Sequence, residues 1–508
     1  MAEQIFLSKS RTDVDRAYVG FTPNGGSIKP VHVANGALRS IFGEYNTTMA
    51  IKRLALVSDS KGVIPKGNEL ETIYDAMKAN EKIEDTIAPN SLEALRNIMQ
   101  RLLSADKGVY VVKGLTDDMI SYTAGSKYFI TRRSMYEDTG EFIGGLIKEY
   151  CPEFAEYIKV LLSDARDPIS LLFEPVLDAD DADMEQFQDI NKHEELPAFQ
   201  SINESTTWYL NGLKDSGQCL LENFRIHPNP LTQLRLFNFF CVFQLIRYMA
   251  MLESFYCGEA IRPILLDFSG KAPSQSSVAR ASEISYTQMH KSINRFYAWG
   301  YAQWLEKHGY GKDELLESEV PAYEEEKNGK TKKKSKTGAN KDALKTLWDL
   351  AKQQAVDYSD EDEVRLAFGE TMYDMLALEA SSHPVNCLKV LGTSSGILYP
   401  PDKSHPNKRF VLSQDVLEML VRSTVLPNEV LNAQEIRERL WNRFGIIVGG
   451  TRFELEKIEN SGMIMQVDED ALEANFSAFS STLEAMDFAE EMADGILQIR
   501  LGGLSDDR

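Results

Sequence analysis

The sequence predicts a predominantly α-helical protein of the α+β class, in which a small N-terminal α+β domain is followed by helical regions. Short β-prone segments broken by turn residues are concentrated before residue 125, whereas apolar residues at three- and four-residue spacing recur after residue 126. The chain has 508 residues, of which 43% are hydrophobic and 26% charged, which is typical of globular proteins. This length suffices for about three or four domains.

Residues 1–125 combine strand-like and helix-like patterns. The strand-like segments are Ala17–Phe21, Ile28–Val33, Arg53–Val57 and Val109–Val112. Leu70–Ala79 and Leu92–Leu103 have helical spacing. A small α+β domain is the simplest interpretation of this mixture.

Residues 126–200 are predicted to form a helical region with an acidic connection. Phe142, Leu146 and Tyr150 are spaced by four, as on one face of a helix. The segment from Asp178 to Glu195 contains eight acidic residues and one lysine, which predicts an exposed connection.

Residues 201–316 are predicted to form a helical domain around a long apolar helix, Leu231–Tyr256. Its most apolar stretch, Leu236–Ile246, is about half as long as the ~20 residues that a membrane span needs. We therefore expect a buried core helix and no membrane association. The following segment, Arg262–Phe268, has the pattern of a short strand.

The segment Ser276–Lys307 predicts two short helices joined by a tight turn. Apolar spacing defines the first helix by Val278, Ala281 and Ile284, and the second by Met289, Ile293 and Phe296. Ser285 and Gln288 have the spacing of a capping box for the second helix. Gly300 is expected to end that helix, and Tyr301–Leu305 to form the first strand of a hairpin.

Over roughly forty residues this segment resembles the winged-helix superfamily. The resemblance implies that the second helix enters the major groove of DNA. Tyr286, Thr287, Gln288 and His290 would then lie near base edges, and Lys291 and Arg295 near phosphates. Because this helix has so few cations, protein contact or core packing is the alternative.

Residues 317–342 change from glutamate-rich to lysine-rich and are predicted to be a charged, disordered linker. The cluster Lys332–Lys336 could contact nucleic acid non-specifically, although a solvated linker is the simpler interpretation. Residues 343–408 are predicted to be helical at Ala343–Lys352 and Glu363–Leu378, and turn-rich at Gly392–Lys408.

Residues 409–508 are predicted to contain a second winged-helix-like module with an acidic helical tail. A helix with Ile436 and Leu440 precedes the pair Gly449-Gly450, and Thr451 with Glu454 forms a capping box for the next helix. Several glutamates on that helix favour protein contact over DNA contact. The tail has an apolar stripe for a partner or, as we expect, for the core, formed by Leu472, Phe476, Phe479 and Leu483.

Signatures of catalysis are absent from the sequence. It contains no phosphate-binding loop, dinucleotide-binding glycine motif, zinc-protease motif or serine-hydrolase motif. The seven histidines and five cysteines are dispersed without metal-ligand spacing. Asp267, after an apolar segment, is interpreted as a buried or capping aspartate. No catalytic residue, metal or cofactor is therefore predicted.

Net charge and motifs together suggest a function class. The net charge of −22 repels phosphates at long range, so any DNA contact has to be local or assisted by a partner. We expect a non-catalytic, DNA-associated accessory or scaffold subunit of a cytoplasmic multiprotein complex, by analogy with bacterial DNA-transaction and antiviral defence systems. Protein partners, and secondarily DNA, are the expected ligands. The alternatives are a purely structural scaffold and an enzyme with an unrecognised site in the N-terminal α+β domain.

Overall fold

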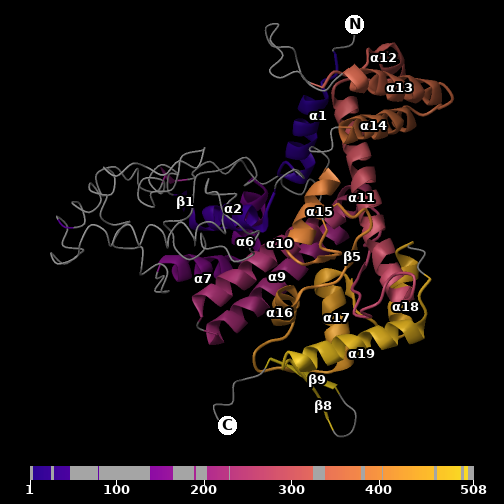
Figure 1. Cartoon of the computed structure of the whole chain (residues 1–508). Helices are drawn as coiled ribbons and strands as arrows, with labels where there is room; N and C mark the ends of the chain where they lie inside the picture. Colours follow the sequence, from indigo (N-terminus) through magenta and orange to yellow (C-terminus); the bar gives the residue numbers. More distant parts are fainter. Residues whose placement is uncertain are drawn as a thin grey trace.

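A computed structural model shows a predominantly helical molecule (Figure 1). It describes residues 4–23, 28–45, 78, 138–163, 188–189, 203–227, 229–323, 338–378, 384–402, 404–462, 466–492 and 497–501. The predicted segments Arg53–Val57, Val109–Val112, Leu92–Leu103, Lys332–Lys336 and most of Leu70–Ala79 lie outside these residues.

The described helices are α1 (Leu7–Val14), the π-turn η1 (Asp15–Val19), α2 (Pro30–Phe42), α6 (Asp138–Tyr150), α7 (Pro152–Ser163), α9 (Glu204–Ile226), α10 (Pro230–Cys257), α11 (Ser277–Lys307), α12 (Lys312–Glu317), α13 (Gly338–Ala355), α14 (Glu361–Ala377), α15 (Pro384–Ser394), α16 (Gln414–Arg422), α17 (Ala433–Phe444), α18 (Arg452–Asn460) and α19 (Glu469–Ala485). The strands are β1 (Glu44–Tyr45), β2 (Gln188–Asp189), β3 (Ile264–Leu265), β4 (Leu398–Tyr399), β5 (Arg409–Phe410), β6 (Val430–Leu431), β7 (Ile446–Ile447), β8 (Ala489–Glu491) and β9 (Leu497–Arg500).

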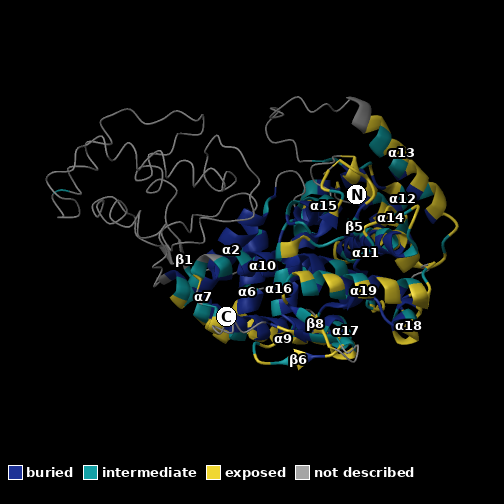
Figure 2. Cartoon of the chain, turned by 60° about the horizontal axis from the view of Figure 1, so that its bottom comes forward, coloured by how far each residue is buried: buried dark blue, intermediate teal, exposed yellow. Residues whose placement is uncertain are grey.

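Helix α10 is the centre of the core, as its apolar sequence predicts. Residues 232–257 are long and apolar enough to cross a membrane, but 94% of their most apolar window is buried inside the fold. Figure 2 shows α10 in the buried interior, beside α2 and α6. A helix that is apolar on all sides is stable in such a position because other helices cover its whole surface.

Two predicted N-terminal strands are wrong. Ala17–Phe21 begins within the π-turn η1, and Ile28–Val33 runs into α2, which begins at Pro30. Short apolar runs do not distinguish a strand from a buried helix, and α2 is buried along nearly its whole length. It packs against α6, where a Cβ added to Gly144 would lie 2.5 Å from the carbonyl oxygen of Ala37.

The turn and the strand predicted within Ser276–Lys307 are also wrong, because α11 is one continuous helix. Ser285 does not cap a helix: its hydroxyl donates to the Pro263 carbonyl at 2.8 Å and accepts from the Leu265 amide at 3.3 Å. Gly300 lies against Val14 of α1, and Tyr301–Leu305 is helical. The apolar residues of both predicted helices instead lie on the buried side of α11, apart from Ile284, which is half-buried.

A small parallel sheet joins distant parts of the chain. Strand β3 pairs with β7, and Leu266 forms a parallel bridge with Phe410. Asn475 of α19 binds the ends of this sheet: its amide nitrogen donates to the carbonyls of Leu266 (2.9 Å) and Val448 (2.6 Å), and its oxygen accepts from the Phe268 amide (2.8 Å). Helix α19 is thereby fixed to the core.

Asp267 is buried at the end of β3, as expected for a structural aspartate. One carboxylate oxygen accepts hydrogen bonds from the amide and hydroxyl of Ser269, and the other lies 3.2 Å from the guanidinium of Arg409. This is a turn-forming arrangement rather than one of convergent carboxylates.

Both ends of the predicted linker, residues 317–342, are structured, and residues 324–337 lie outside the described residues. Backbone bonds tie Ala322 and Tyr323 to the N-terminal segment, where Leu7 and Ser8 donate to their carbonyl oxygens. At the other end, α13 begins at Gly338. The predicted helix Ala343–Lys352 is confirmed as part of α13, and Glu363–Leu378 is confirmed as part of α14 except for its last residue, which caps the helix.

The C-terminal elements form a compact unit at the end of α11 opposite α12–α14 (Figure 1). The predicted capping box of Thr451 and Glu454 is confirmed at the start of α18. Strand β9 lies between β6 and β8 in a three-stranded antiparallel sheet. The apolar stripe of α19 is buried, which confirms its predicted use in core packing.

Candidate nucleic-acid interface on helix α11

All six residues predicted to contact DNA lie in the middle part of α11, from Tyr286 to Arg295, but they do not share one surface. Thr287 and Lys291 are exposed, and Gln288 is half-buried. The Thr287 hydroxyl donates to the Glu283 carbonyl at 2.9 Å within the helix.

Tyr286 is 2% exposed, so its side chain is not accessible to a DNA base. Its hydroxyl oxygen is 2.6 Å from Nε2 of the half-buried His290, and its ring is 6.2 Å from that of Phe410. Burial raises the pKa of this hydroxyl above its ordinary value, so it stays neutral. Tyr286 and His290 therefore act together in packing α11 against β5.

Arg295 is committed to an ion pair. Its guanidinium forms a two-point contact with Glu253 of α10, with Nη2 at 2.9 Å, and Arg262 contacts the same carboxylate at 3.2 Å. Burial alone would raise the pKa of Glu253, but the hydrogen bonds from Arg295 and the charge of Arg262 lower it. A buried carboxylate needs these cations, so phosphate contact by Arg295 would break a structural contact.

A different set of residues on α11 remains accessible, which we call the α11 stripe: Arg280, Thr287 and Lys291. Thr287 and Lys291 follow Arg280 by seven and eleven residues. These separations correspond to about two and three turns of helix, so the three side chains project from one side of α11. All three are exposed. Among the described residues no carboxylate forms an ion pair with Arg280 or Lys291, so both cations are available to an external anion.

Arg280 is not among the predicted DNA contacts, because the predicted turn assigns this residue to a separate, first helix. With a turn near Ser285, Arg280 and Lys291 would lie on different helices. The spacing of eleven residues was visible in the sequence, but its meaning depends on the helix being continuous.

The C-terminal unit offers no comparable cationic surface on α19. Asp470 and Glu473 are exposed on this helix, together with Ala474, Ser477 and Ser481. From residue 458 to residue 499 the sequence has no lysine or arginine. This surface repels a phosphate backbone.

Within the part of the chain that the structure describes, no group of three or more histidine, cysteine, aspartate or glutamate side chains is arranged to hold a metal ion. Most of the predicted N-terminal α+β domain lies outside that part, so the enzymatic alternative stays a prediction.

Comparisons with protein-family models, curated proteins and solved structures find no match to this chain.

Proposed function

We propose that this protein is a non-catalytic accessory or scaffold subunit of a cytoplasmic multiprotein complex that works at DNA, in the class of bacterial DNA-transaction and antiviral defence systems. The observation that carries the DNA part of the proposal is the α11 stripe, because Arg280 and Lys291 are exposed cations on a 31-residue helix and form no ion pair with any carboxylate that the structure describes. Such cations contact phosphates by releasing condensed counter-ions.

We further propose that residues 414–501 are a winged-helix-like module used for protein contact. The order is α16, β6, α17, β7, α18, α19, β8, β9, in which β7 pairs with β3 outside this segment. The segment ends in the antiparallel pair of β8 and β9, and β9 also pairs with β6, which follows the first helix. Helix α19, rather than α18, precedes the hairpin and takes the place of a recognition helix. Its acidic surface supports a protein partner and argues against DNA there.

A salt series of duplex DNA binding tests the DNA contact. We expect the double variant Arg280→Ala, Lys291→Ala to bind more weakly and to flatten the slope of log K against log salt by about 1.8, since each lost phosphate contact removes about 0.9. Fluorescence anisotropy with a labelled duplex measures both quantities.

The matched control is the double variant Lys214→Ala, Lys345→Ala, which removes the same charge from exposed positions on α9 and α13. Its slope should equal that of the wild type. Absence of binding at low salt, or equal slopes for all three proteins, would refute the DNA contact.

An affinity pull-down with and without nuclease tests the scaffold part, since protein docking survives nuclease treatment.

A further inference from the structure

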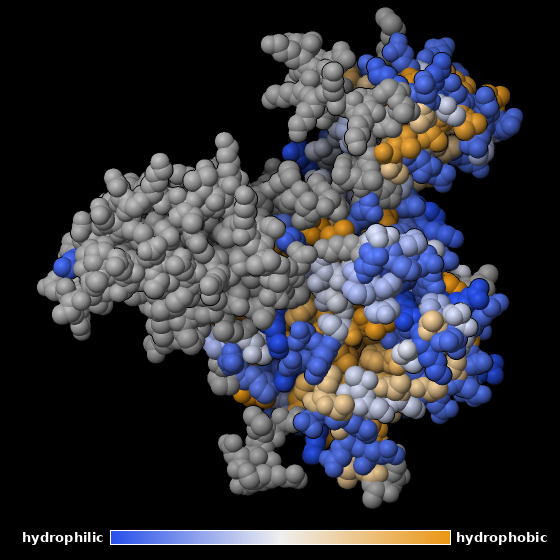
Figure 3. Space-filling view, in the orientation of Figure 1, coloured by the Kyte–Doolittle hydropathy of each residue, from blue (hydrophilic) through white to orange (hydrophobic). Residues whose placement is uncertain are grey.

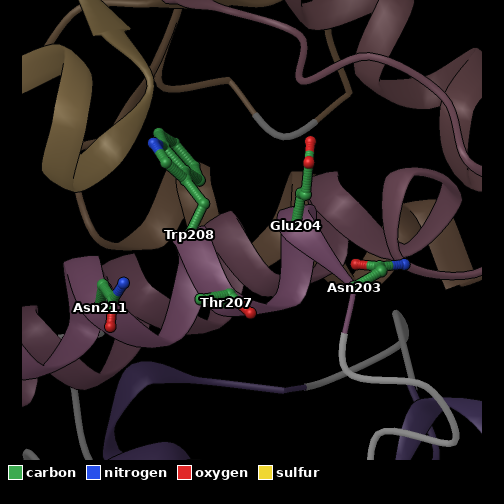
Figure 4. Close-up of a pocket in the computed structure, with 5 residues that line it drawn as sticks. All are labelled: Asn203, Glu204, Thr207, Trp208 and Asn211. Atoms are coloured by element: carbon green, nitrogen blue, oxygen red, sulfur yellow. The ribbon is translucent and has the colours of Figure 1, made fainter.

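A pocket lies at the start of α9. It has a volume of about 640 Å³, is open to solvent, and is lined by Asn203, Glu204, Thr207, Trp208 and Asn211. Figure 4 shows Trp208 and Glu204 projecting from the same side of the helix. An indole ring and a carboxylate therefore flank one opening.

The polar groups of this pocket differ in their availability. The Asn203 side chain is used for capping, since its oxygen accepts from the Thr206 amide at 2.9 Å and its nitrogen donates to the Phe255 carbonyl at 2.7 Å. Glu204, Thr207 and Asn211 are exposed, and no described residue pairs with their side chains. Within the described part of the chain, the pocket thus presents one carboxylate without an ion-pair partner, with a hydroxyl and an amide beside it.

Trp208 is held in place by its neighbours. The guanidinium carbon of Arg247 lies 4.7 Å from the centre of the indole ring, and Trp441 of α17 lies 6.4 Å away. Arg247 is 1% exposed, and burial lowers its pKa to about 9, so it is still charged at neutral pH. The contacts with Arg247 and Trp441 hold the indole ring in place, and Glu204 takes no part in them.

Aromatic and cationic side chains continue from Trp441 onto α18. The Lys457 ammonium lies 5.0 Å from the Trp441 ring centre and 4.3 Å from that of Phe453, which is 56% exposed. Exposed aromatic residues of this kind are enriched at the centres of protein interfaces. The pocket therefore belongs to a surface suited to another protein.

We propose that the Trp208 pocket receives an arginine side chain from a basic segment of a partner protein. A guanidinium stacks on indole and forms two parallel hydrogen bonds with one carboxylate, which matches the indole of Trp208 beside the exposed carboxylate of Glu204. The net charge of −22 attracts a basic partner and repels a polyanionic one.

Fluorescence anisotropy with the full-length protein tests this pocket. The probes are four labelled molecules: a nonapeptide of alternating glycine and arginine, its lysine and citrulline counterparts, and a single-stranded oligothymidylate. We expect the arginine peptide to bind best. Glu204→Gln should weaken its binding at least tenfold, because a charge-assisted two-point contact is lost.

The control variant Glu370→Gln removes one exposed carboxylate from α14 and should leave binding unchanged. Thermal unfolding of both variants verifies that they are folded. Equal binding of the lysine or citrulline peptide, equal affinity of Glu204→Gln and wild type, or preference for the oligothymidylate would each overturn the proposal. The pocket and the α11 stripe share no residue, so failure of either experiment leaves the other proposal standing.

Discussion

At the scale of single residues, the most consequential group is the buried carboxylate of Asp15 in the π-turn η1. It is 0% exposed, lies 3.3 Å from the Nε of Arg11, and accepts a hydrogen bond of 2.8 Å from the Tyr297 hydroxyl of α11. Burial raises its pKa from 3.8 to about 7, against the opposing effects of Arg11 and Tyr297, and the charge of Asp138 adds to the increase. This carboxyl therefore titrates near neutral pH.

The sign of the resulting pH dependence follows from linkage. Because the pKa of Asp15 is higher in the folded than in the unfolded state, its stabilising contribution is complete below about pH 4 and is lost as the pH rises through about 7. The difference in free energy of unfolding between wild type and Asp15→Asn should thus fall over this range, by on the order of 2–4 kcal/mol.

Urea denaturation at a series of pH values measures this difference. The exposed Asp470→Asn is the matched control and should show a difference that does not change over the same range. If the difference in free energy of unfolding between wild type and Asp15→Asn were constant from pH 4 to pH 8, this would contradict the raised pKa of Asp15.

At the scale of elements, α11 organises the fold because other helices approach it closely along its length. A Cβ added to Gly369 of α14 would overlap the carbonyl oxygen of Ala298, so the two helix backbones are in direct contact. Tyr297 and Tyr373 stack across the same interface, with ring centres 5.5 Å apart. Glycine is required here by the small distance between two helices.

Gly369→Ala should destabilise the protein by about 1–3 kcal/mol, because the added methyl group forces α14 away from α11. Thermal unfolding and the near-ultraviolet circular dichroism of the stacked tyrosines measure this effect. Replacement of the neighbouring exposed Glu370 by alanine serves as the control and should change the stability by less than about 0.5 kcal/mol. Unchanged stability of Gly369→Ala would show that the two helices can separate without cost.

At the scale of the whole molecule, a large hydrophobic core includes buried residues from Ile5 to Leu501, and a smaller cluster lies around Leu265, Ile447 and Leu472. Apolar side chains also remain on the surface: Figure 3 shows hydrophobic residues on the α13–α14 hairpin, where Leu350 and Val356 are 48% and 62% exposed. The continuous core predicts that the described elements unfold together.

Phe240→Ala in α10 tests this cooperativity. Phe240 is 0% exposed, and its truncation should cost about 3–5 kcal/mol. Hydrogen exchange should show an equal loss of protection in α2 and α19, although these helices are far apart in the sequence. The exposed Leu350→Ala is expected to have little effect on either helix. Loss of protection in α2 alone would indicate separate cooperative units.

Local patterns in the sequence predicted the parts of the fold that depend on neighbouring residues. Thr451 and Glu454 form the expected cap because both partners of each hydrogen bond lie within one turn. The apolar run of α10 predicted its burial for a similar reason, since a helix without a polar side needs complete coverage. The stripe of α19 was predicted to pack inward on the same grounds.

The tertiary structure alone decided what Ser285 does. Its spacing to Gln288 satisfies the capping pattern, yet its hydrogen-bond partners are Pro263 and Leu265, about twenty residues away. A side-chain hydroxyl bonds equally well to an amide of its own helix or of a neighbouring strand, so sequence spacing does not distinguish the two. The same limit applies to Arg295, whose partner Glu253 lies on α10.

By itself, then, the sequence determined that the protein is mostly helical, has an apolar central helix and carries a strong negative charge. Helical periodicity, hydrophobicity and charge are properties of adjacent residues or simple sums, and no contact is needed to evaluate them. Only the tertiary structure decided that α11 is continuous, that Arg280 and Lys291 share one side of it, and that Glu204 and Trp208 flank a pocket. These features depend on which distant segments satisfy each other's polar groups and cover each other's apolar surfaces.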